Sequence, residues 1–293
     1  MDLCYIVYIV FHTINENMNA DYSKKMGFEG LGTSERQSLA RLWRASKTTI
    51  TAELAAKVWQ LTPVQAAKRL AQLNKKGWLE RISQGVYILV PIESLTSDIV
   101  PEEPFAIASE MFAPCYIGGV NAANYWDLTE QLFRTITVMT EKNVQNRNPV
   151  LAGTEYVLHT LKPKYFYGLK SIWLSGVKVK ISDPTRTLID MLMFPDFCGG
   201  INFIVDVLGN YLKSEMKNIE QFIEHLKLAP NGAALKRLGF LLEAKYPEEQ
   251  KLMDYCQKNL TTGYAKLNPA QTCDKLVTKW RVWVPQSWKE KAV

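Results

Sequence analysis

The sequence has few of the residues that build disulfide bonds and metal sites. Its five cysteines are far apart and include no Cys-X-X-Cys pair, and its three histidines are isolated as well. A disulfide framework needs paired cysteines, and a structural zinc site needs Cys and His at close spacing. We therefore expect neither, and we expect no metal, no cofactor and a reducing, cytoplasmic environment. The residues concerned are Cys4, Cys115, Cys198, Cys256, Cys273, His12, His159 and His225.

A long hydrophobic run is missing near the N-terminus. The apolar stretch there covers residues 3–11, which is far short of the ~20 residues that span a bilayer. It also lacks the basic segment and the small-residue cleavage site of a signal peptide. We therefore expect no membrane segment. We expect residues 1–30 to be a disordered or mis-called extension, with Met18 or Met26 as alternative starts.

Acidic residues are scarce in one part of the chain. Residues 31–90 contain ten Lys or Arg and three Asp or Glu, whereas the rest contains 25 and 26. All of the net positive charge is therefore concentrated in one fifth of the sequence. A small basic module beside a neutral body indicates a polyanionic partner, although a basic surface can also serve solubility alone.

Length and composition favour a globular protein of about two domains, because the 293 residues are 47% hydrophobic. The pattern of elements predicts an α+β protein: an N-terminal winged helix-turn-helix and a larger mixed α/β C-terminal domain. We expect an extension (1–30), a winged helix-turn-helix (31–90), a Pro-containing linker (91–104), a second domain (105–285) and a tail (286–293).

Three short helices are predicted in the basic segment. Thr33-Ser34, Thr51 and Thr62 can each cap a helix N-terminus with a side-chain oxygen. Pro63 then occupies the first helical position, where its missing N–H costs nothing. These starts divide the segment into a helix-turn-helix preceded by one further helix.

A β-hairpin is predicted directly after the third helix. Gly77 is a typical helix terminator because it adopts the left-handed conformation without strain. Residues 78–82 and 86–90 have the composition of short strands, and Gly85 lies in the turn between them. This hairpin is the expected wing.

Helical spacing divides the three helices into apolar and polar sides. We expect the core to contain Leu39, Leu42, Trp43, Leu54, Ala55, Val58, Val64, Ala67, Leu70, Ala71 and Leu73. The N-terminal half of the third helix is the part that usually enters the major groove, so Gln65, Lys68 and Arg69 are predicted to contact bases. The complete set of predicted DNA contacts is Lys57, Thr62, Gln65, Lys68, Arg69, Gln72, Lys75, Lys76, Arg81 and Gln84.

Four of these contacts are assigned to phosphates, which position a protein on DNA without specifying the sequence. They are Lys57, Lys75, Lys76 and Arg81. Two other interpretations stay open: a helix with exposed Lys and Gln is often only a solvated surface, and winged helices also dock proteins.

The second domain is predicted to mix helices and strands. Helical patterns occur at residues 106–112, 121–126, 185–193, 201–212, 219–226 and 233–244. Strand patterns occur at residues 135–139, 155–161, 172–174, 177–181 and 280–284.

Several segments resemble those of one known family. They are residues 70–87, 118–123, 128–131, 182–190, 198–201, 237–243, 263–264, 267–269 and 280–281. Residues 183–190 resemble an Asp-Pro-X-(Lys/Arg)-Thr-Leu-X-Asp segment, and residues 237–243 resemble an Arg-Leu-Gly-X-Leu-Leu-Glu helix. Over residues 31–285 the chain resembles the AbiEi-type antitoxins of type IV toxin–antitoxin (abortive infection) systems. Trp126-Asp127 departs from the pattern, where many relatives have His-Gly.

The resemblance implies an autoregulatory antitoxin. The winged helix would repress the protein's own operon at inverted repeats in the promoter, and the second domain would counteract the toxin. The toxin would be a nucleotidyltransferase encoded next door, neutralised without a stable complex.

The residues of these motifs also have plain structural interpretations. Asp183 is a good helix cap, and Arg186 with Asp190 is an i,i+4 pair worth only ~0.3–0.5 kcal/mol when exposed. Arg237 and Glu243 are expected to be a solvated or domain-contact pair.

Enzyme activity is not expected. Asp183, Glu243 and Lys245 imitate a metal-dependent nuclease set, but their spacing is long and two of them lie in a helical pattern. Gly118-Gly119 lacks the acidic pair of a nucleotidyltransferase and the lysine of a P-loop, and is expected to allow close packing at a helix start.

Three functional hypotheses follow: an autoregulatory antitoxin, a transcription factor for other genes whose second domain senses a ligand or partner, and a DNA-directed enzyme. The sequence favours the first.

Overall fold

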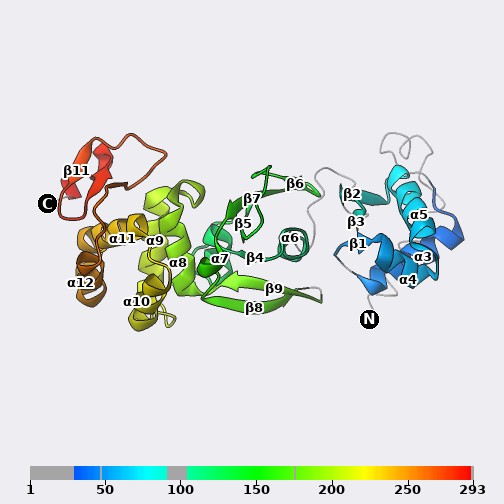
Figure 1. Ribbon diagram of the computed structural model, residues 1–293, viewed down its shortest axis with the longest axis horizontal. Helices are drawn as coiled ribbons and strands as arrows, with labels where there is room; N and C mark the ends of the chain where they lie inside the picture. Colours follow the sequence, from blue (N-terminus) through cyan, green and yellow to red (C-terminus); the bar gives the residue numbers. More distant parts are fainter. Residues whose placement is uncertain (1–29, 47, 91–103, 175, 292–293) are drawn as a thin grey trace. The chain divides into compact units, whose positions relative to one another are not determined.

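The structure is a computed structural model of the chain, and it describes residues 30–46, 48–90, 104–174 and 176–291 (Figure 1). The chain divides into two compact units: the first contains residues 1–102 and 151–153, and the second contains residues 103–150 and 154–293. Nearly all of the expected N-terminal extension (1–30) and of the expected linker (91–104) lies outside the described residues. Within those ranges, no helix combines the length and the apolar character that a membrane crossing requires.

The first unit is a winged helix-turn-helix, as the sequence predicts. Its elements are α3 (Thr33–Ala45), β1 (Ile50–Thr51), α4 (Ala52–Trp59), α5 (Pro63–Lys75), β2 (Leu79–Ser83) and β3 (Val86–Leu89). The hairpin strands β2 and β3 pair in antiparallel fashion, and β1 adds a third strand with Ile50 opposite Tyr87. The strand β1 is an element that the sequence analysis missed, because two residues carry no periodic signal.

Two of the predicted helix caps are confirmed. The Thr51 hydroxyl accepts a hydrogen bond from the Leu54 N–H at 3.2 Å. Thr62 and Gln65 form a capping box: the Thr62 hydroxyl accepts from the Gln65 N–H at 3.3 Å, and the Gln65 side chain accepts from the Thr62 N–H at 3.0 Å. Each bond satisfies a backbone donor that a helix start would leave unpaired.

The predicted cap of the first helix is wrong. Thr33 and Ser34 lie inside α3, and Gly32 is the cap residue. The carboxylate of Glu35 accepts a hydrogen bond from the Gly32 N–H at 3.1 Å. This contact from the third helical position satisfies the N–H of the cap residue, although Gly32 has no side chain with which to cap the first turn.

The core of the first unit differs from the predicted one on α5. Leu70 and Leu73 are buried as expected, and Ala66 is buried beside them. Four residues predicted in the core are exposed instead: Trp43, Val64, Ala67 and Ala71. Residues 66, 70 and 73 also have helical spacing, so periodicity alone allowed two faces, and packing against α3 and α4 selects the one with larger side chains.

The wing follows α5 through a turn that needs glycine. Gly77 has a φ of 84°, a left-handed conformation that favours glycine over residues with a Cβ. Its N–H donates to the Asn74 carbonyl, and the Asn74 side chain donates to the Leu79 carbonyl at 2.7 Å. These two bonds fix the direction in which β2 leaves the helix.

The second unit is built on a six-stranded mixed sheet with the order β6-β7-β5-β4-β9-β8. The strands are β4 (Cys115–Ile117), β5 (Ile136–Thr140), β6 (Val150–Leu151), β7 (Thr154–Thr160), β8 (Leu169–Leu174) and β9 (Val177–Ser182). The pairs β5–β7 and β4–β9 are parallel, whereas β4–β5 and β8–β9 are antiparallel. Sequence analysis predicted the longer strands and missed β4 and β6, which are three and two residues long.

The helices of the second unit lie mostly around α8, although the first of them contacts the six-stranded sheet instead (Figure 1). They are α6 (Pro104–Phe112), α7 (Gly119–Tyr125), α8 (Pro184–Met193), α9 (Gly200–Lys213), α10 (Ile219–Leu228), α11 (Gly232–Lys245) and α12 (Gln250–Lys258), with the short 3₁₀ turns η2 (Pro163–Tyr165), η3 (Pro195–Phe197) and η4 (Gln286–Lys291). Leu188, Ile189 and Leu192 of α8 are buried with Leu208 of α9 and Leu238 of α11 in one apolar cluster. The predicted helices are all present, and α12 is additional.

A small sheet completes the C-terminal part, with the order β10-β12-β11. Its strands are β10 (Ala265–Lys266), β11 (Lys275–Val277) and β12 (Val282–Val284). Trp280 before β12 is fully buried in the apolar cluster around α8.

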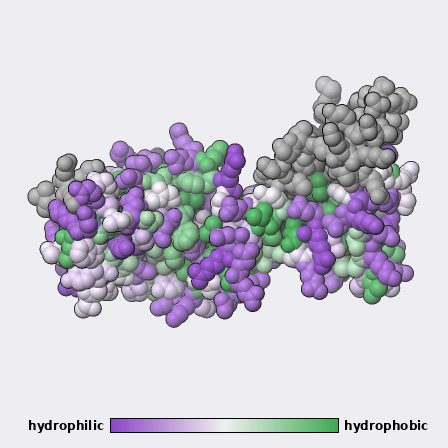
Figure 2. Space-filling view, turned by 90° about the horizontal axis from the view of Figure 1, so that it is seen from above, coloured by the Kyte–Doolittle hydropathy of each residue, from purple (hydrophilic) through white to green (hydrophobic). Residues whose placement is uncertain are grey.

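On the face that Figure 2 shows, hydrophilic and hydrophobic residues are intermingled.

Candidate nucleic-acid interface

One side of α5 faces solvent along its whole length. The buried side is formed by Ala66, Leu70 and Leu73. The exposed residues on this side are Val64, Gln65, Ala67, Lys68, Ala71, Gln72 and Lys75, and Pro63 at the helix start is exposed as well. No acidic residue lies in α5, so this surface offers cations, amides and small apolar groups. Side chains of that kind suit the phosphates and base edges of duplex DNA.

Eight of the ten predicted DNA contacts are exposed. They are Lys57, Thr62, Gln65, Lys68, Gln72, Lys75, Arg81 and Gln84. Arg69 and Lys76 are half-buried and bind other parts of the first unit. Contact with DNA itself stays a prediction for all ten.

Arg69 holds α5 against the two preceding helices. Its Nη2 donates to the Ser38 hydroxyl of α3 at 2.7 Å, and its guanidinium lies 5.0 Å from the centre of the Trp59 ring of α4. The Trp59 indole N–H in turn donates to the Ser38 carbonyl at 3.1 Å. The guanidinium is therefore already engaged, and Arg69 is better placed to orient the helix than to read a base.

Lys76 is engaged in a similar way. Its ammonium group lies 2.8 Å from the Glu35 carboxylate of α3. The hydrogen bond from Lys76 keeps the pKa of Glu35 below its ordinary value. Any phosphate contact by Lys76 would have to compete with this carboxylate, whereas Lys75 next to it is exposed. Sequence analysis did not single out Glu35, because its partner is 41 residues away.

Gln65 combines a structural contact with exposure. Its Oε1 accepts hydrogen bonds from the Thr62 N–H and the Thr62 hydroxyl, both at 3.0 Å. The amide NH₂ group of Gln65 is then the part that can serve an outside acceptor. A contact of this side chain with adenine would therefore be through a single donor and would not be bidentate.

A hollow of about 370 Å³ lies beside the exposed side of α5. It is lined by Glu35, Leu61, Gln65, Lys68, Arg69, Gln72 and Leu73. Four of these are predicted DNA contacts, so the structure brings that subset together around one depression. Glu35 and Leu61 are members that the sequence analysis did not foresee.

The predicted contacts on the wing are at its hairpin. Gln84 is exposed in the turn next to Gly85, and Arg81 is exposed on β2. The Arg81 Nε donates to the Ser83 carbonyl at 3.2 Å, which holds the side chain along its own strand. Lys57 is exposed on α4.

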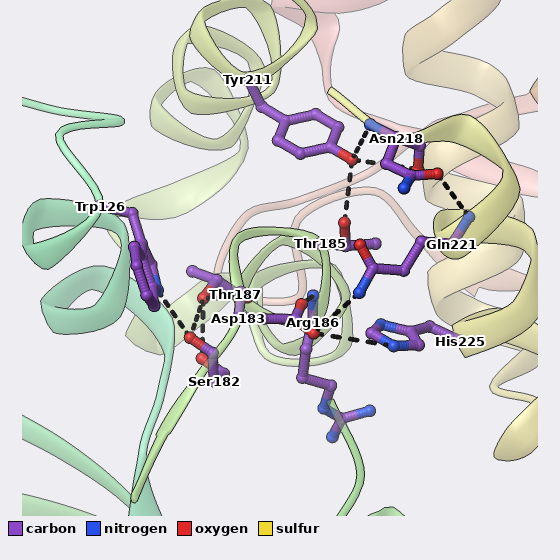
Figure 3. A network of polar contacts seen from close by, with 10 residues as sticks. All are labelled: Trp126, Ser182, Asp183, Thr185, Arg186, Thr187, Tyr211, Asn218, Gln221 and His225. Carbon is purple, nitrogen blue, oxygen red and sulfur yellow. Dashed lines mark hydrogen bonds and ion pairs between the residues drawn. The ribbon is translucent and has the colours of Figure 1, made fainter. Parts of the chain in front are cut away.

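A second group of polar residues lies around the start of α8 in the other unit (Figure 3). The Asp183 carboxylate caps the helix by accepting from the Arg186 N–H at 2.7 Å, as predicted. The Ser182 and Thr187 hydroxyls are 2.7 Å apart, and the Trp126 indole donates to the Ser182 carbonyl at 2.7 Å. Trp126, where the family pattern was not met, therefore has a defined structural partner.

The same carboxylate contacts α10. Gln221 donates to Asp183 Oδ2 at 3.3 Å, and His225 Nε2 lies 3.7 Å from that oxygen. Burial has the largest influence on both ionisable groups: it raises the pKa of Asp183 and lowers the pKa of His225, and their mutual attraction opposes it. In Figure 3 the Arg186 side chain points away from Gln221 and His225.

The Arg186–Asp190 pair is buried, not exposed. Arg186 Nη2 lies 2.7 Å from Asp190 Oδ1, and both side chains are 0% exposed. Arg186 donates to the Tyr116 hydroxyl at 3.0 Å, Tyr116 donates to Asp190 at 3.1 Å, and the Tyr167 ring lies 4.4 Å from the guanidinium. Burial is the largest single influence and acts to lower the pKa of Arg186, but Asp190, Tyr116 and Tyr167 together outweigh it, so the pKa is raised.

Arg237 and Glu243 do not form the predicted solvated pair. Arg237 is buried in α11 and donates to the Leu192 carbonyl at 2.7 Å and to the Lys266 carbonyl at 2.9 Å. Glu243 accepts from the Trp280 indole N–H at 2.6 Å. Each side chain is therefore used to fasten α11 to a different segment.

The carboxylates that imitate a nuclease set in the sequence, Asp183 and Glu243, can be located in the structure. Asp183 contacts α10, whereas Glu243 contacts Trp280 and Lys279, so the two carboxylates have separate partners. Among the residues that the structure describes, no three His, Cys, Asp or Glu side chains are grouped as a metal ion would need. A Cβ on Gly118 would lie 3.0 Å from Asp190 Oδ2, so this glycine permits the predicted close packing before α7.

No family model matches the sequence, and a comparison with curated proteins finds no relative. The structure is similar to the crystal structure of RV2827C protein from Mycobacterium tuberculosis, with a TM-score of 0.58. The alignment covers 88% of this chain and 93% of that one, and 14% of the aligned residues are identical. At this identity the likeness shows a shared fold over most of both chains.

Proposed function

We propose that the first unit binds double-stranded DNA by placing the exposed side of α5 in the major groove. The observation that carries this proposal is the composition of that side: seven exposed residues that include two lysines and two glutamines and no acid. The net charge of +7 over residues 31–90 supports it, because phosphate neutralisation dominates the affinity of DNA-binding proteins.

We further propose that the protein is an antitoxin that represses its own operon. This part is supported by the motif resemblance in residues 118–123, 128–131, 182–190 and 237–243. The residues behind those motifs fasten α8 and α11 to their neighbours, so they support a common fold. In this proposal the second unit counteracts a nucleotidyltransferase toxin without a stable complex, and it has no catalytic role of its own.

The test combines promoter binding with toxin rescue. We expect the protein to retard DNA from upstream of its own gene and to restore growth when it is co-expressed with a neighbouring nucleotidyltransferase gene. Deleting residues 1–95 should abolish promoter binding and leave rescue intact.

A charge-matched pair of variants makes the binding test specific. Lys68→Ala with Lys75→Ala should lose promoter binding, whereas Lys213→Ala with Lys258→Ala, exposed lysines of the second unit, should retain it. Binding to a different promoter without rescue would favour a regulator of other genes. Failure of both assays would contradict the proposal.

A further inference from the structure

Part of the exposed side of α5 is apolar. Val64 is 69% exposed in the first turn of the helix, and Ala71 is exposed two turns later. With 3.6 residues per turn, Val64, Lys68, Ala71 and Lys75 lie in one line along the helix, directly opposite the buried leucines. We call these four residues the α5 ridge. It alternates apolar and cationic side chains.

The surroundings of the α5 ridge restrict what can cover it. On one flank Arg69 and Lys76 bind α3, and on the other Asn74 binds the wing strand β2. The helix is therefore held from both sides, and the exposed side chains between these contacts are the ridge with the adjacent Gln65, Ala67 and Gln72.

Duplex DNA is the partner that matches both properties of the ridge. Its phosphates suit the lysines, and the one apolar group on the edges of the major groove is the thymine C5-methyl. A protein partner fits less well, because lysines are depleted from the cores of protein–protein interfaces. An exposed valine one turn before a lysine is thus explained by a groove that carries both methyl groups and phosphates.

We infer that Val64 contacts a thymine C5-methyl group in the major groove and makes the protein select thymine at that position. The side chain of Ala71 is only a methyl group, so the helix backbone can come close to the base edges at this position. This inference rests on the proposed function, because it requires α5 to enter the groove.

The test uses a duplex that the protein selects from a random pool. Each thymine of the selected duplex is replaced in turn by deoxyuridine, which lacks only the methyl group. Burying one methyl-sized group is worth ~0.8 kcal/mol, or about fourfold in affinity. We expect one or two positions at which the full-length protein loses about fourfold in affinity, and no effect at the others.

Val64→Ala identifies the side chain that makes the contact. This variant should bind the thymine duplex about fourfold more weakly than the unchanged protein does, and deoxyuridine at the sensitive position should weaken it no further. Leu132→Ala is the matched control, because Leu132 is an 86% exposed apolar residue of the second unit. It should keep both the affinity and the deoxyuridine effect.

A second pair of variants tests whether a small side chain is needed at position 71. Ala71→Leu adds bulk at an exposed position of α5 and should lower the affinity at least tenfold. Ala40→Leu, at an exposed position of α3, should leave it unchanged.

The outcomes separate this inference from the proposed function. If the protein selects a sequence but no deoxyuridine lowers affinity, or if Val64→Ala keeps the deoxyuridine effect, the inference is overturned and DNA binding stands. If Val64→Ala impairs toxin rescue and leaves DNA affinity unchanged, the ridge binds a protein and the inference is overturned. If no sequence is selected from the pool, the proposed function fails as well.

Discussion

At the scale of single residues, the fully buried pair Arg186–Asp190 shows how strongly environment changes the meaning of a motif. The two residues are one helical turn apart and would contribute little on a surface. Here neither is reached by solvent, and Tyr116 bonds both. Removing one charge would leave the other buried without compensation, which costs much more than losing a surface pair.

Asp190→Ala should therefore lower the free energy of unfolding by about 3–5 kcal/mol, measured by urea denaturation. Glu220→Ala is the matched control, since it breaks the pair with Lys251 whose side chains are 64% and 69% exposed; the expected loss is below about 1 kcal/mol. The double variant Arg186→Met with Asp190→Leu should lose less than Asp190→Ala. If Asp190→Ala and Glu220→Ala lowered the free energy of unfolding equally, the assignment of Arg186–Asp190 as a buried, stabilising pair would be contradicted.

His159 is a second residue whose burial has a measurable consequence. Its ring stacks on the Phe194 ring, with the two ring centres 4.5 Å apart, and it meets the Phe197 ring edge-on, with the centres 4.8 Å apart. Burial, followed by the nearby charge of Arg147, lowers the pKa of His159 to about 4. The unfolded chain binds the proton near pH 6.5, so protonation favours unfolding.

The contribution of neutral His159 is thus complete above pH 6.5 and is lost as the pH falls toward 4, by about 2–3 kcal/mol. His159→Phe should remove this part of the acid sensitivity. Urea unfolding of both proteins at several pH values between 4 and 7.5 measures the difference. Parallel curves for the two proteins over that range would show that His159 does not titrate as described.

At the scale of elements, α5 depends on contacts with α3 and α4 for its position. Arg69 connects it to Ser38 and Trp59, and Lys76 connects it to Glu35. The residue that the sequence places among the base contacts therefore acts as a positioning residue. A variant at this site should affect every DNA sequence, because it moves the whole helix.

Arg69→Ala should lower the free energy of unfolding by about 1–3 kcal/mol. It removes the charged hydrogen bond to the Ser38 hydroxyl, and Ser38 is a buried residue. Its affinity for DNA should fall by a similar factor for every single-base variant of the selected duplex. Arg69→Lys should recover part of both properties. A loss confined to one base pair would instead identify Arg69 as a base contact.

At the scale of the whole molecule, charge is segregated. Residues 31–90 carry +7 and the rest of the chain carries −1, so the attraction to a polyanion should come almost entirely from the first unit. Of the lysines near the end of α5, Lys75 is exposed and Lys76 is paired with Glu35.

Lys75→Ala should reduce the slope of log affinity against log salt concentration by about 0.9, the value for one phosphate contact. Lys76→Ala should change the slope less, because part of its charge is already compensated by Glu35. Titrations with one duplex at several salt concentrations give both slopes. A larger change for Lys76 would show that its pair opens on DNA.

The sequence alone determined the features that depend on neighbouring residues. Thr51 and Thr62 cap helices, Asp183 caps α8, and Gly77 ends α5, because each bond or turn involves residues three or four positions away. The order of helices and long strands followed for the same reason, since periodicity is a local property. Two-residue strands escaped it because they are too short to show a period.

Only the tertiary structure decided which side of each element is covered. Helical spacing allowed Val64 or Ala66 to face the core, and packing against α3 and α4 chose Ala66. The engagement of Arg69 depends on Ser38, 31 residues away, and the burial of the Arg186–Asp190 pair depends on Tyr116, 70 residues from Arg186. Such contacts join parts of the chain that meet only on folding, so the α5 ridge and its exposed Val64 could not be recognised before the fold was known.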